Sequence, residues 1–88
     1  MWHEKMAEDF SDRIIFTSSK IDSRRDVARL EDELSGLEGV RDVTVDPERH
    51  TVEIIFDPTV ISATALHSQV EELGYRIDAV SEQERLPL

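Results

Sequence analysis

The chain has 88 residues, of which 39% are hydrophobic and 34% charged, and this composition suits one small soluble domain with a modest core. Twenty Asp and Glu against ten Lys and Arg give a formal net charge of −10, which disfavours binding to nucleic acid and to anionic membrane surfaces. The absence of cysteine excludes disulfides, thiolate metal sites, iron–sulfur clusters and cysteine nucleophiles.

The central part of the chain contains one pattern twice, and its first copy reads strand, helix, strand. Residues 14–16 form a short β-branched and aromatic run, which predicts a strand. Residues 43–45 alternate apolar and polar side chains, as is typical of a strand with one buried face. Between them lies a predicted helix, whose apolar residues recur at helical spacing beside a glycine that can cap its end: Val27, Leu30, Leu34, Leu37 and Gly36.

The second copy repeats this order. Residues 51–57 alternate as a strand, and the Asp-Pro start of segment 46–50 predicts a turn that joins this strand to the previous one as a hairpin. A last strand is expected at residues 75–79. The helix before it is predicted to begin at a capping serine and to close at a glycine, with apolar residues at helical spacing between them: Ser62, Ala63, Leu66, Val70, Leu73 and Gly74.

The resulting order is βαββαβ, which predicts an α+β fold of the ferredoxin-like type. Right-handed crossovers place both helices on one face of a four-stranded antiparallel sheet. We assign residues 13–80 to this domain and interpret residues 1–12 and 81–88 as N-terminal and C-terminal tails. The fold by itself does not indicate a function.

Two short motifs connect the chain to a known family. One is Leu-Glu-Gly-Val at residues 37–40, before the second predicted strand, and the other is Leu-Gly-Tyr at residues 73–75, before the last one. With these motifs at this spacing, residues 13–80 resemble the heavy-metal-associated (HMA) domain of copper chaperones and of the cytosolic arms of metal-transporting P-type ATPases. The resemblance implies a non-catalytic domain that binds a metal ion and docks against partner domains.

The resemblance also implies where the metal site would lie. Members of the family carry Gly-Met-x-Cys-x-x-Cys across the first loop and the start of the first helix, where two thiolates bind a soft ion such as Cu(I). In this chain the cysteine positions fall on Ser23 and Asp26, and Ile21 takes the place of the core methionine. A hydroxyl and a carboxylate are hard donors, whereas Cu(I) prefers sulfur ligands. We therefore predict that the inherited copper site is degenerate and does not function.

The substituted residues have an ordinary structural interpretation. Ser23-x-x-Asp26 matches a capping box, in which the serine accepts a backbone N–H near the helix start and the acidic residue reaches back. The helix dipole favours a negative charge at this position, as it would a thiolate. On this interpretation the former metal site has become a helix N-terminus.

A basic patch near the helix start favours a different interpretation. Arg24 and Arg25 lie in the predicted first turn, where positive charge opposes the helix dipole, and Lys20 is close by in the sequence. Such a patch can hold an anion or the carboxylates of a partner protein. The alternative is that Asp22 and Asp26 neutralise the two arginines locally. The sequence leaves both interpretations open.

The amino terminus offers a second candidate metal site. The terminal amine of Met1, two deprotonated amides and the imidazole of His3 form a square-planar set that suits Cu(II) or Ni(II). This gives an alternative function, a heavy-metal-binding or metal-transport protein that uses the terminal amine, histidine and carboxylates in place of thiols. We interpret His50 and His67 as surface histidines, because neither has ligand spacing to another candidate.

The sequence contains no catalytic motif, and we predict no enzymatic activity, no catalytic residue and no cofactor. It has no Gly-x-Ser-x-Gly and no glycine loop that could cradle a phosphate. Acylphosphatases share the predicted topology, but they need a glycine-rich first loop with an arginine, and residues 18–22 contain no glycine.

Our prediction from the sequence is a non-enzymatic HMA-like domain with a degenerate metal motif, which acts as a protein-interaction or regulatory module. No apolar run approaches the roughly 20 residues that span a bilayer, and the first ten residues do not resemble a secretory signal. We therefore expect a cytoplasmic protein without membrane insertion. An open sheet edge is a second candidate surface, for self-association. The predicted partner surface is the former metal loop with one later residue: Lys20, Ile21, Asp22, Ser23, Arg24, Arg25, Asp26 and Tyr75.

Overall fold

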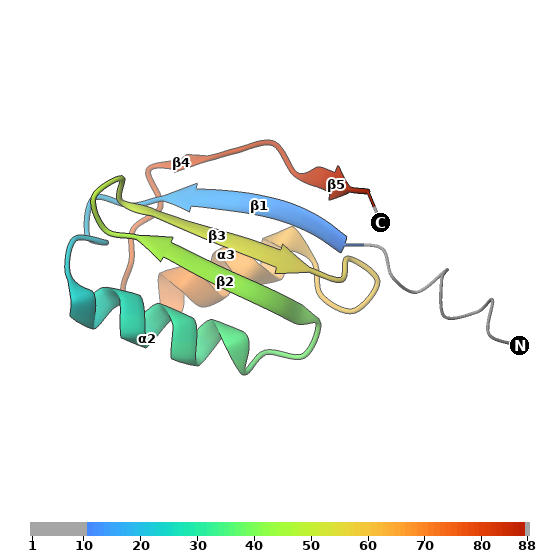
Figure 1. Ribbon diagram of the computed structural model, residues 1–88, viewed down its shortest axis with the longest axis horizontal. Coiled ribbons are helices and arrows are strands. Elements are labelled where there is room, and N and C mark those ends of the chain that lie inside the picture. The colour runs from blue at the N-terminus through green and yellow to red at the C-terminus, as the bar shows by residue number, and fades with distance from the viewer. Residues whose placement is uncertain (1–10, 88) are drawn as a thin grey trace, which may run out of the picture.

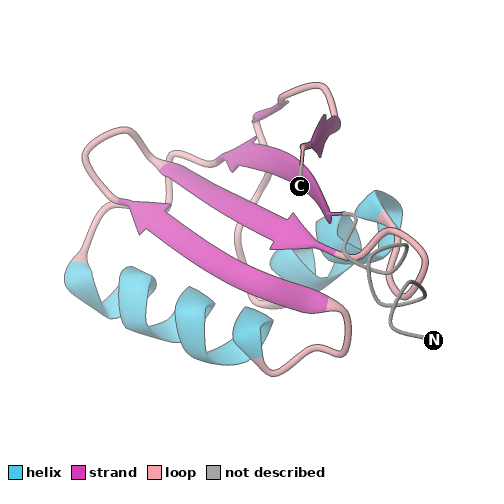
Figure 2. Cartoon of the chain, turned by 45° about the vertical axis from the view of Figure 1, so that its right-hand side comes forward, coloured by secondary structure: helices cyan, strands magenta, loops and turns pink. Residues whose placement is uncertain are grey.

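The computed structural model describes residues 11–87, which form an antiparallel sheet with both helices on one face (Figures 1 and 2). This is the ferredoxin-like α+β sandwich that the sequence predicts. The sheet has the order β2-β3-β1-β4, and a further strand, β5, also pairs with β1. Neither helix is long and apolar enough to cross a membrane. The elements are β1 (Ser11–Thr17), α2 (Arg24–Ser35), β2 (Val40–Asp46), β3 (Thr51–Phe56), α3 (Ala63–Glu72), β4 (Ala79–Val80) and β5 (Glu84–Leu86).

The core lies between the sheet and the two helices. Successive side chains of a strand point to opposite faces, so every second residue of β1 and β3 is buried against the helices. Helices α2 and α3 each contribute two fully buried side chains four residues apart. The apolar residues buried in these four elements are Ile14, Phe16, Leu30, Leu34, Val52, Ile54, Phe56, Leu66 and Val70.

The glycines of the two family-like motifs occupy backbone conformations that other residues rarely adopt. Gly39 has φ +96° and Gly74 has φ +101°, both in the left-handed region. At Gly39 a Cβ atom would also lie 2.9 Å from the side chains of Val60 and Ile61. Glycine is required there both by the backbone angle and by the close approach of the loop before α3.

The C-terminal part of the sheet differs from the prediction. Residues 75–78 are not in a strand, and the predicted last strand is reduced to β4. Segment 81–88, which we interpreted as a tail, contains β5, which pairs with Ser11–Arg13 of β1. Strand β1 itself begins at Ser11, inside the segment assigned to the N-terminal tail. The longer β1 exposes additional backbone groups at its edge, and β5 satisfies some of them.

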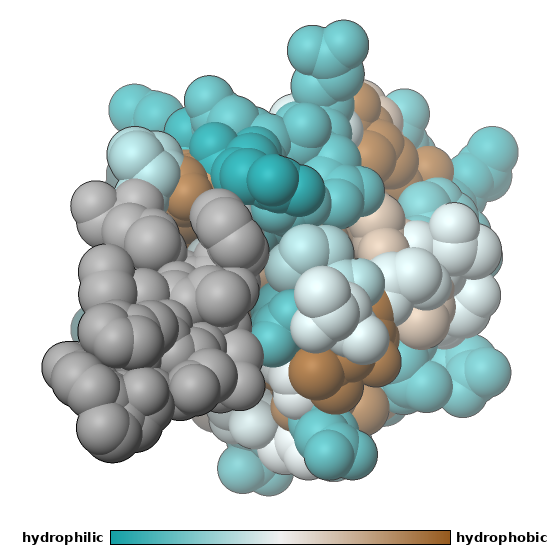
Figure 3. All heavy atoms as spheres, turned by 90° about the vertical axis from the view of Figure 1, so that its right-hand side faces the viewer, coloured by the Kyte–Doolittle hydropathy of each residue, from teal (hydrophilic) through white to brown (hydrophobic). Residues whose placement is uncertain are grey.

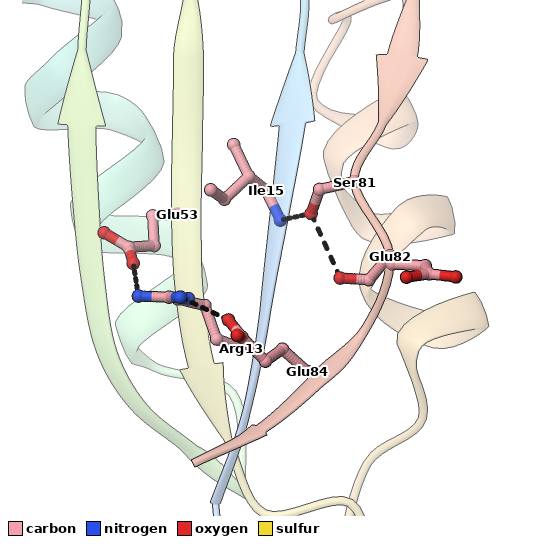
Figure 4. A network of polar contacts seen from close by, with 6 residues as sticks. All are labelled: Arg13, Ile15, Glu53, Ser81, Glu82 and Glu84. Carbon is pink, nitrogen blue, oxygen red and sulfur yellow. Dashed lines mark hydrogen bonds and ion pairs between the residues drawn. The ribbon is translucent and has the colours of Figure 1, made fainter.

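Polar contacts hold this C-terminal segment against β1 (Figure 4). Ser81 bridges the gap between β4 and β5, because its hydroxyl accepts from the Ile15 amide at 2.9 Å and its own amide donates to the Ile15 carbonyl at 2.9 Å. On the open face of the sheet, Arg13 forms ion pairs with both Glu53 and Glu84. These contacts follow from spatial proximity across three strands, so the sequence pattern gave no signal for them.

Candidate functional site

The loop between β1 and α2 lies at the end of the molecule that also carries the β2–β3 turn and the segment leading to β4 (Figure 1). Ile21 is fully buried and anchors the loop in the core, as expected for the residue at the family methionine position. The side chains around it are exposed or half-buried. We call this region the loop face and define it by the predicted partner residues, Lys20–Asp26 and Tyr75. Ile21 and Tyr75 are buried in the core, so the prediction that these two contact a partner directly is corrected, and the exposed part of the loop face is formed by the other residues.

The β2–β3 turn supports the loop from one side. The Ser18 amide donates to the His50 carbonyl at 2.8 Å, and His50 Nδ1 lies 2.9 Å from the Ile21 carbonyl oxygen. His50 has φ +60°, a left-handed conformation that is uncommon outside glycine. The sequence predicts only a surface histidine at His50, and its local pattern does not indicate this supporting role. The contact could have been expected from the βαββαβ topology, because this topology places the β2–β3 turn and the β1–α2 loop at the same end of the sheet.

The predicted capping box is present at the start of α2. The Asp26 amide donates to Ser23 Oγ at 3.4 Å, and Asp26 Oδ2 accepts from the Ser23 amide at 3.1 Å. The same carboxylate oxygen also accepts from the Asp22 amide at 3.1 Å and from the Ser23 hydroxyl at 2.9 Å. Ser23 and Asp26, the two residues at the family cysteine positions, are therefore hydrogen-bonded to each other.

Tyr75 joins this network from the other side of the loop face. Its hydroxyl donates to Asp26 Oδ1 at 2.6 Å, and the Arg29 guanidinium carbon lies 5.9 Å from the centre of its ring. The Tyr75 hydroxyl, with the amides and hydroxyl of the capping box, lowers the pKa of Asp26 from 3.8 to about 2. Burial and the neighbouring carboxylate raise the pKa of Tyr75 to about 12. Asp26 is thus ionised, with both oxygens accepting hydrogen bonds.

The Asp26 network makes the stability of the domain sensitive to acid. Because the folded-state pKa of about 2 lies below the ordinary value of 3.8, ionised Asp26 stabilises the fold above pH 4, and this stabilisation is lost as the pH falls toward 2. Tyr75→Phe removes the hydroxyl and is expected to cost about 1 kcal/mol at neutral pH. It should also reduce the loss of stability between pH 7 and pH 3, measured by urea unfolding.

Ser35→Ala is the matched control for Tyr75→Phe. The Ser35 hydroxyl donates to the Asp32 carbonyl, so its removal also deletes a hydroxyl from α2 but leaves every carboxylate untouched. The control should keep the wild-type pH dependence. If Tyr75→Phe and wild type lose the same free energy between the two pH values, the hydroxyl does not set the acid sensitivity.

Comparison with known proteins identifies the family of the chain. Residues 15–76 match the profile of the heavy-metal-associated domain. The chain belongs to this family. Copper-transporting ATPase 2 of Homo sapiens is 34% identical over 56 residues, which are 64% of this chain and 4% of that protein. The same protein of Mus musculus is 29% identical over 68 residues, which are 77% of this chain and 5% of that protein. The HMA chain thus spans a small part of these relatives.

Two solved structures share the fold. Oxidized MerP from Ralstonia metallidurans CH34 has a TM-score of 0.73 and 19% identity, with 82% of this chain and 99% of that one covered. A putative copper-ion-binding protein from Bacillus anthracis str. Ames has a TM-score of 0.66 and 20% identity, with 81% of this chain and 99% of that one covered. At this level of identity the likeness shows the ferredoxin-like fold alone.

The donor atoms of this HMA domain do not fit a soft metal ion. Ser23 and Asp26 present oxygen in place of sulfur, and those oxygens already take part in the capping box and in the bond to Tyr75. Within residues 11–87, no group of three or more His, Asp or Glu side chains could hold a metal ion. The candidate terminal ligands Met1 and His3 lie outside the described residues, so the amino-terminal site stays a prediction.

The basic residues of the loop face form no ion pair within the described part of the chain, and the exposed Arg29 and Arg76 share this property. The side chains of Lys20, Arg24 and Arg25 are exposed, and none of them forms an ion pair with a described carboxylate. Asp22 and Asp26 therefore do not neutralise Arg24 and Arg25 by direct contact. The basic residues that do form ion pairs belong to the strands and to the β2–β3 turn: Arg13, Arg41, Arg49 and Arg85.

Proposed function

We propose that this HMA domain is a non-enzymatic protein-interaction or regulatory module that docks a partner through the loop face and does not carry Cu(I). The observation that supports this most directly is the pair of exposed arginines, Arg24 and Arg25, without ion-pair partners among the described residues of a chain whose net charge is −10. Positive charge at a helix start opposes the helix dipole. A role in binding accounts for its presence there. A cytoplasmic location is part of this proposal.

The shape and chemistry of the loop face favour a partner that is rich in carboxylates. A shallow hollow in this face is lined by basic and acidic side chains together with the capping serine: Lys20, Asp22, Ser23, Arg24, Arg25 and Asp26. The guanidinium groups can each bind a carboxylate with two hydrogen bonds. Because Asp26 is committed to the capping box and to Tyr75, the arginines determine what this surface attracts.

The sheet edges are less suited to self-association than the sequence suggested. Strand β2 contains an irregularity between Val40 and Asp42, and Arg41 and Asp42 are both exposed charges. At the other edge β4 and β5 have two and three residues. Bulges, charged residues and short edge strands all oppose pairing with another sheet. We therefore place the main interaction surface on the loop face.

Removing the positive charge of the loop face tests this function. Arg24→Ala/Arg25→Ala is expected to weaken binding of an oligoglutamate peptide by roughly fivefold to tenfold, because each exposed ion pair contributes up to about 1 kcal/mol. The affinity is measured by NMR titration, in which the amide signals of residues 20–26 and 75 should shift. Added salt should weaken binding by wild type more than binding by the variant.

Ser35→Glu/Ser68→Glu is the matched control. It lowers the net charge by two, as the double alanine variant does, but at exposed positions on α2 and α3 away from the loop face. If the control loses as much affinity as the arginine variant, net charge alone governs binding. Equal affinity of wild type and the arginine variant would contradict the proposed docking surface.

A further inference from the structure

A mostly apolar hollow of about 360 Å³ lies beside β1, on the opposite side of the domain core from α2. Phe16 and His67 meet inside it edge to face, with ring centres 5.6 Å apart and planes at 88°. Such a contact is typical of aromatic rings packed in a protein interior. The hollow is lined by side chains from β1, α3 and β4: Ile14, Phe16, Ala63, Thr64, His67 and Val80.

The broken edge strand leaves this hollow open. Strand β4 pairs only with Phe16 and Thr17, and β5 pairs only with Ser11–Arg13, so a single residue, Ser81, meets the part of β1 between them. As a result Val80 is 47% exposed. Figure 3 views the molecule from the end where β1 begins and shows several separate apolar patches among hydrophilic side chains. The two core residues that line the hollow, Ile14 and Phe16, are themselves 4% and 0% exposed, so the hollow lies over a closed core.

The start of β1 lies at the same end of the molecule as the start of α3, which lines the hollow. Asp12 pairs with Phe56, the last residue of β3, and a short loop leads from there to Ala63 at the start of α3. Residues 1–10 precede β1 directly. An extended chain covers about 3.3 Å per residue and a helix about 1.5 Å, so ten residues can reach the hollow in either form.

The composition of residues 1–10 suits an apolar hollow. Trp2, Met6 and Phe10 are large apolar residues at every fourth position, the spacing that places side chains on one face of a helix. The residues between them include charged side chains that would stay in water: Glu4, Lys5, Glu8 and Asp9.

We propose that the hollow beside β1 is the docking site of the chain's own residues 1–10, with their apolar side chains against Ile14, His67 and Val80. An attached segment has a high effective concentration at its site, whereas a free partner must first be captured from solution. A second copy is disfavoured further, because two chains of net charge −10 repel each other. The proposal concerns a surface distinct from the loop face and does not rest on the proposed function.

Trp2 is the only tryptophan of the chain and reports directly on this docking. In wild type its emission should be shifted to the blue, and its quenching by acrylamide should be roughly threefold weaker than in the isolated peptide of residues 1–10, because a docked indole is shielded from water. Val80→Glu places a charge in the hollow and should bring the quenching close to that of the peptide.

Val60→Glu is the matched control, because Val60 is 51% exposed but does not line the hollow. It should keep the wild-type emission and quenching, and circular dichroism should show that both variants are folded. Wild-type quenching equal to that of the free peptide would overturn the proposal. Protection of Trp2 that vanishes on dilution would also overturn it, since the occupant would then be the segment of a second copy.

Discussion

Ser23→Cys/Asp26→Cys is expected to give a domain that binds a single Cu(I) ion, whereas we expect the wild-type domain to bind none. The two positions lie at the exposed start of α2, three residues apart on a loop that Ile21 anchors in the core. Two thiolates there would supply the soft ligands that this ion prefers, and the helix dipole would stabilise them as anions. We therefore expect that exchanging these two residues restores the donor atoms, although Lys20 and Ile21 also depart from the Gly-Met of the family motif.

Native mass spectrometry and competition with a Cu(I) chelator measure this change. Ser23→Ala/Asp26→Ala is the control, because it removes the capping box without adding sulfur. Both double variants should lose about 1 kcal/mol or more of stability, since a lost N-cap alone costs about that much. Only the cysteine variant should retain metal under competition.

Two results would contradict this account of the site. Stoichiometric Cu(I) on the wild-type protein would show that oxygen donors suffice, or that ligands outside the described residues take part. Failure of a folded cysteine variant to bind Cu(I) would show that the loop no longer has the family geometry. A wild-type protein that instead binds one Cu(II) or Ni(II), lost in His3→Ala, would favour the amino-terminal site.

Ile21→Ala is expected to lower the free energy of unfolding by about 2–5 kcal/mol, the range for replacing a buried isoleucine or leucine by alanine. Ile21 is fully buried, and its carbonyl oxygen contacts His50, so it links the loop to the core and to the β2–β3 turn. Urea unfolding measures the loss. Amide hydrogen exchange should also rise in residues 18–26, because the cavity leaves the loop without its anchor.

Ile21→Met separates the loss of volume from the change of residue type. It nearly conserves side-chain volume and introduces the residue that the family carries at this place, so it should cost less than about 1.5 kcal/mol and leave exchange in the loop unchanged. A loss in Ile21→Ala as small as that in Ile21→Met would show that the core collapses around the site. Fast exchange in both variants would show that the branched shape is what holds the loop.

The alternation and helical spacing of apolar residues predicted most of the elements correctly. Strands β1 to β3 and both helices lie where the pattern placed them, because each buries one face and the burial period is visible in the sequence. The capping box was also predicted, since its partners are three residues apart. Gly39 and Gly74 sit in left-handed conformations at the positions of the two family-like motifs.

The C-terminal edge was predicted poorly for a physical reason. Residues 84–86 are exposed or half-buried and have no apolar alternation, so the sequence pattern does not distinguish this strand from a tail. Backbone hydrogen bonds to β1, the ion pair of Glu84 with Arg13, and a bond from Gln83 to the buried Asp12 hold it in place. Residues 75–78, which precede β4, are not in a strand. In this segment Tyr75 donates a hydrogen bond to Asp26, which lies 49 residues earlier in the chain.

The sequence by itself determined the order of the elements, the family resemblance, the loss of both metal-binding thiols and the cap that replaces them, because these depend on residue type and on spacing within a few positions. Only the tertiary structure decided that Tyr75 completes the Asp26 network, that His50 supports the loop and that a broken edge strand opens a hollow beside β1. Those features depend on contacts between segments that are distant in the sequence, and local periodicity does not predict such contacts.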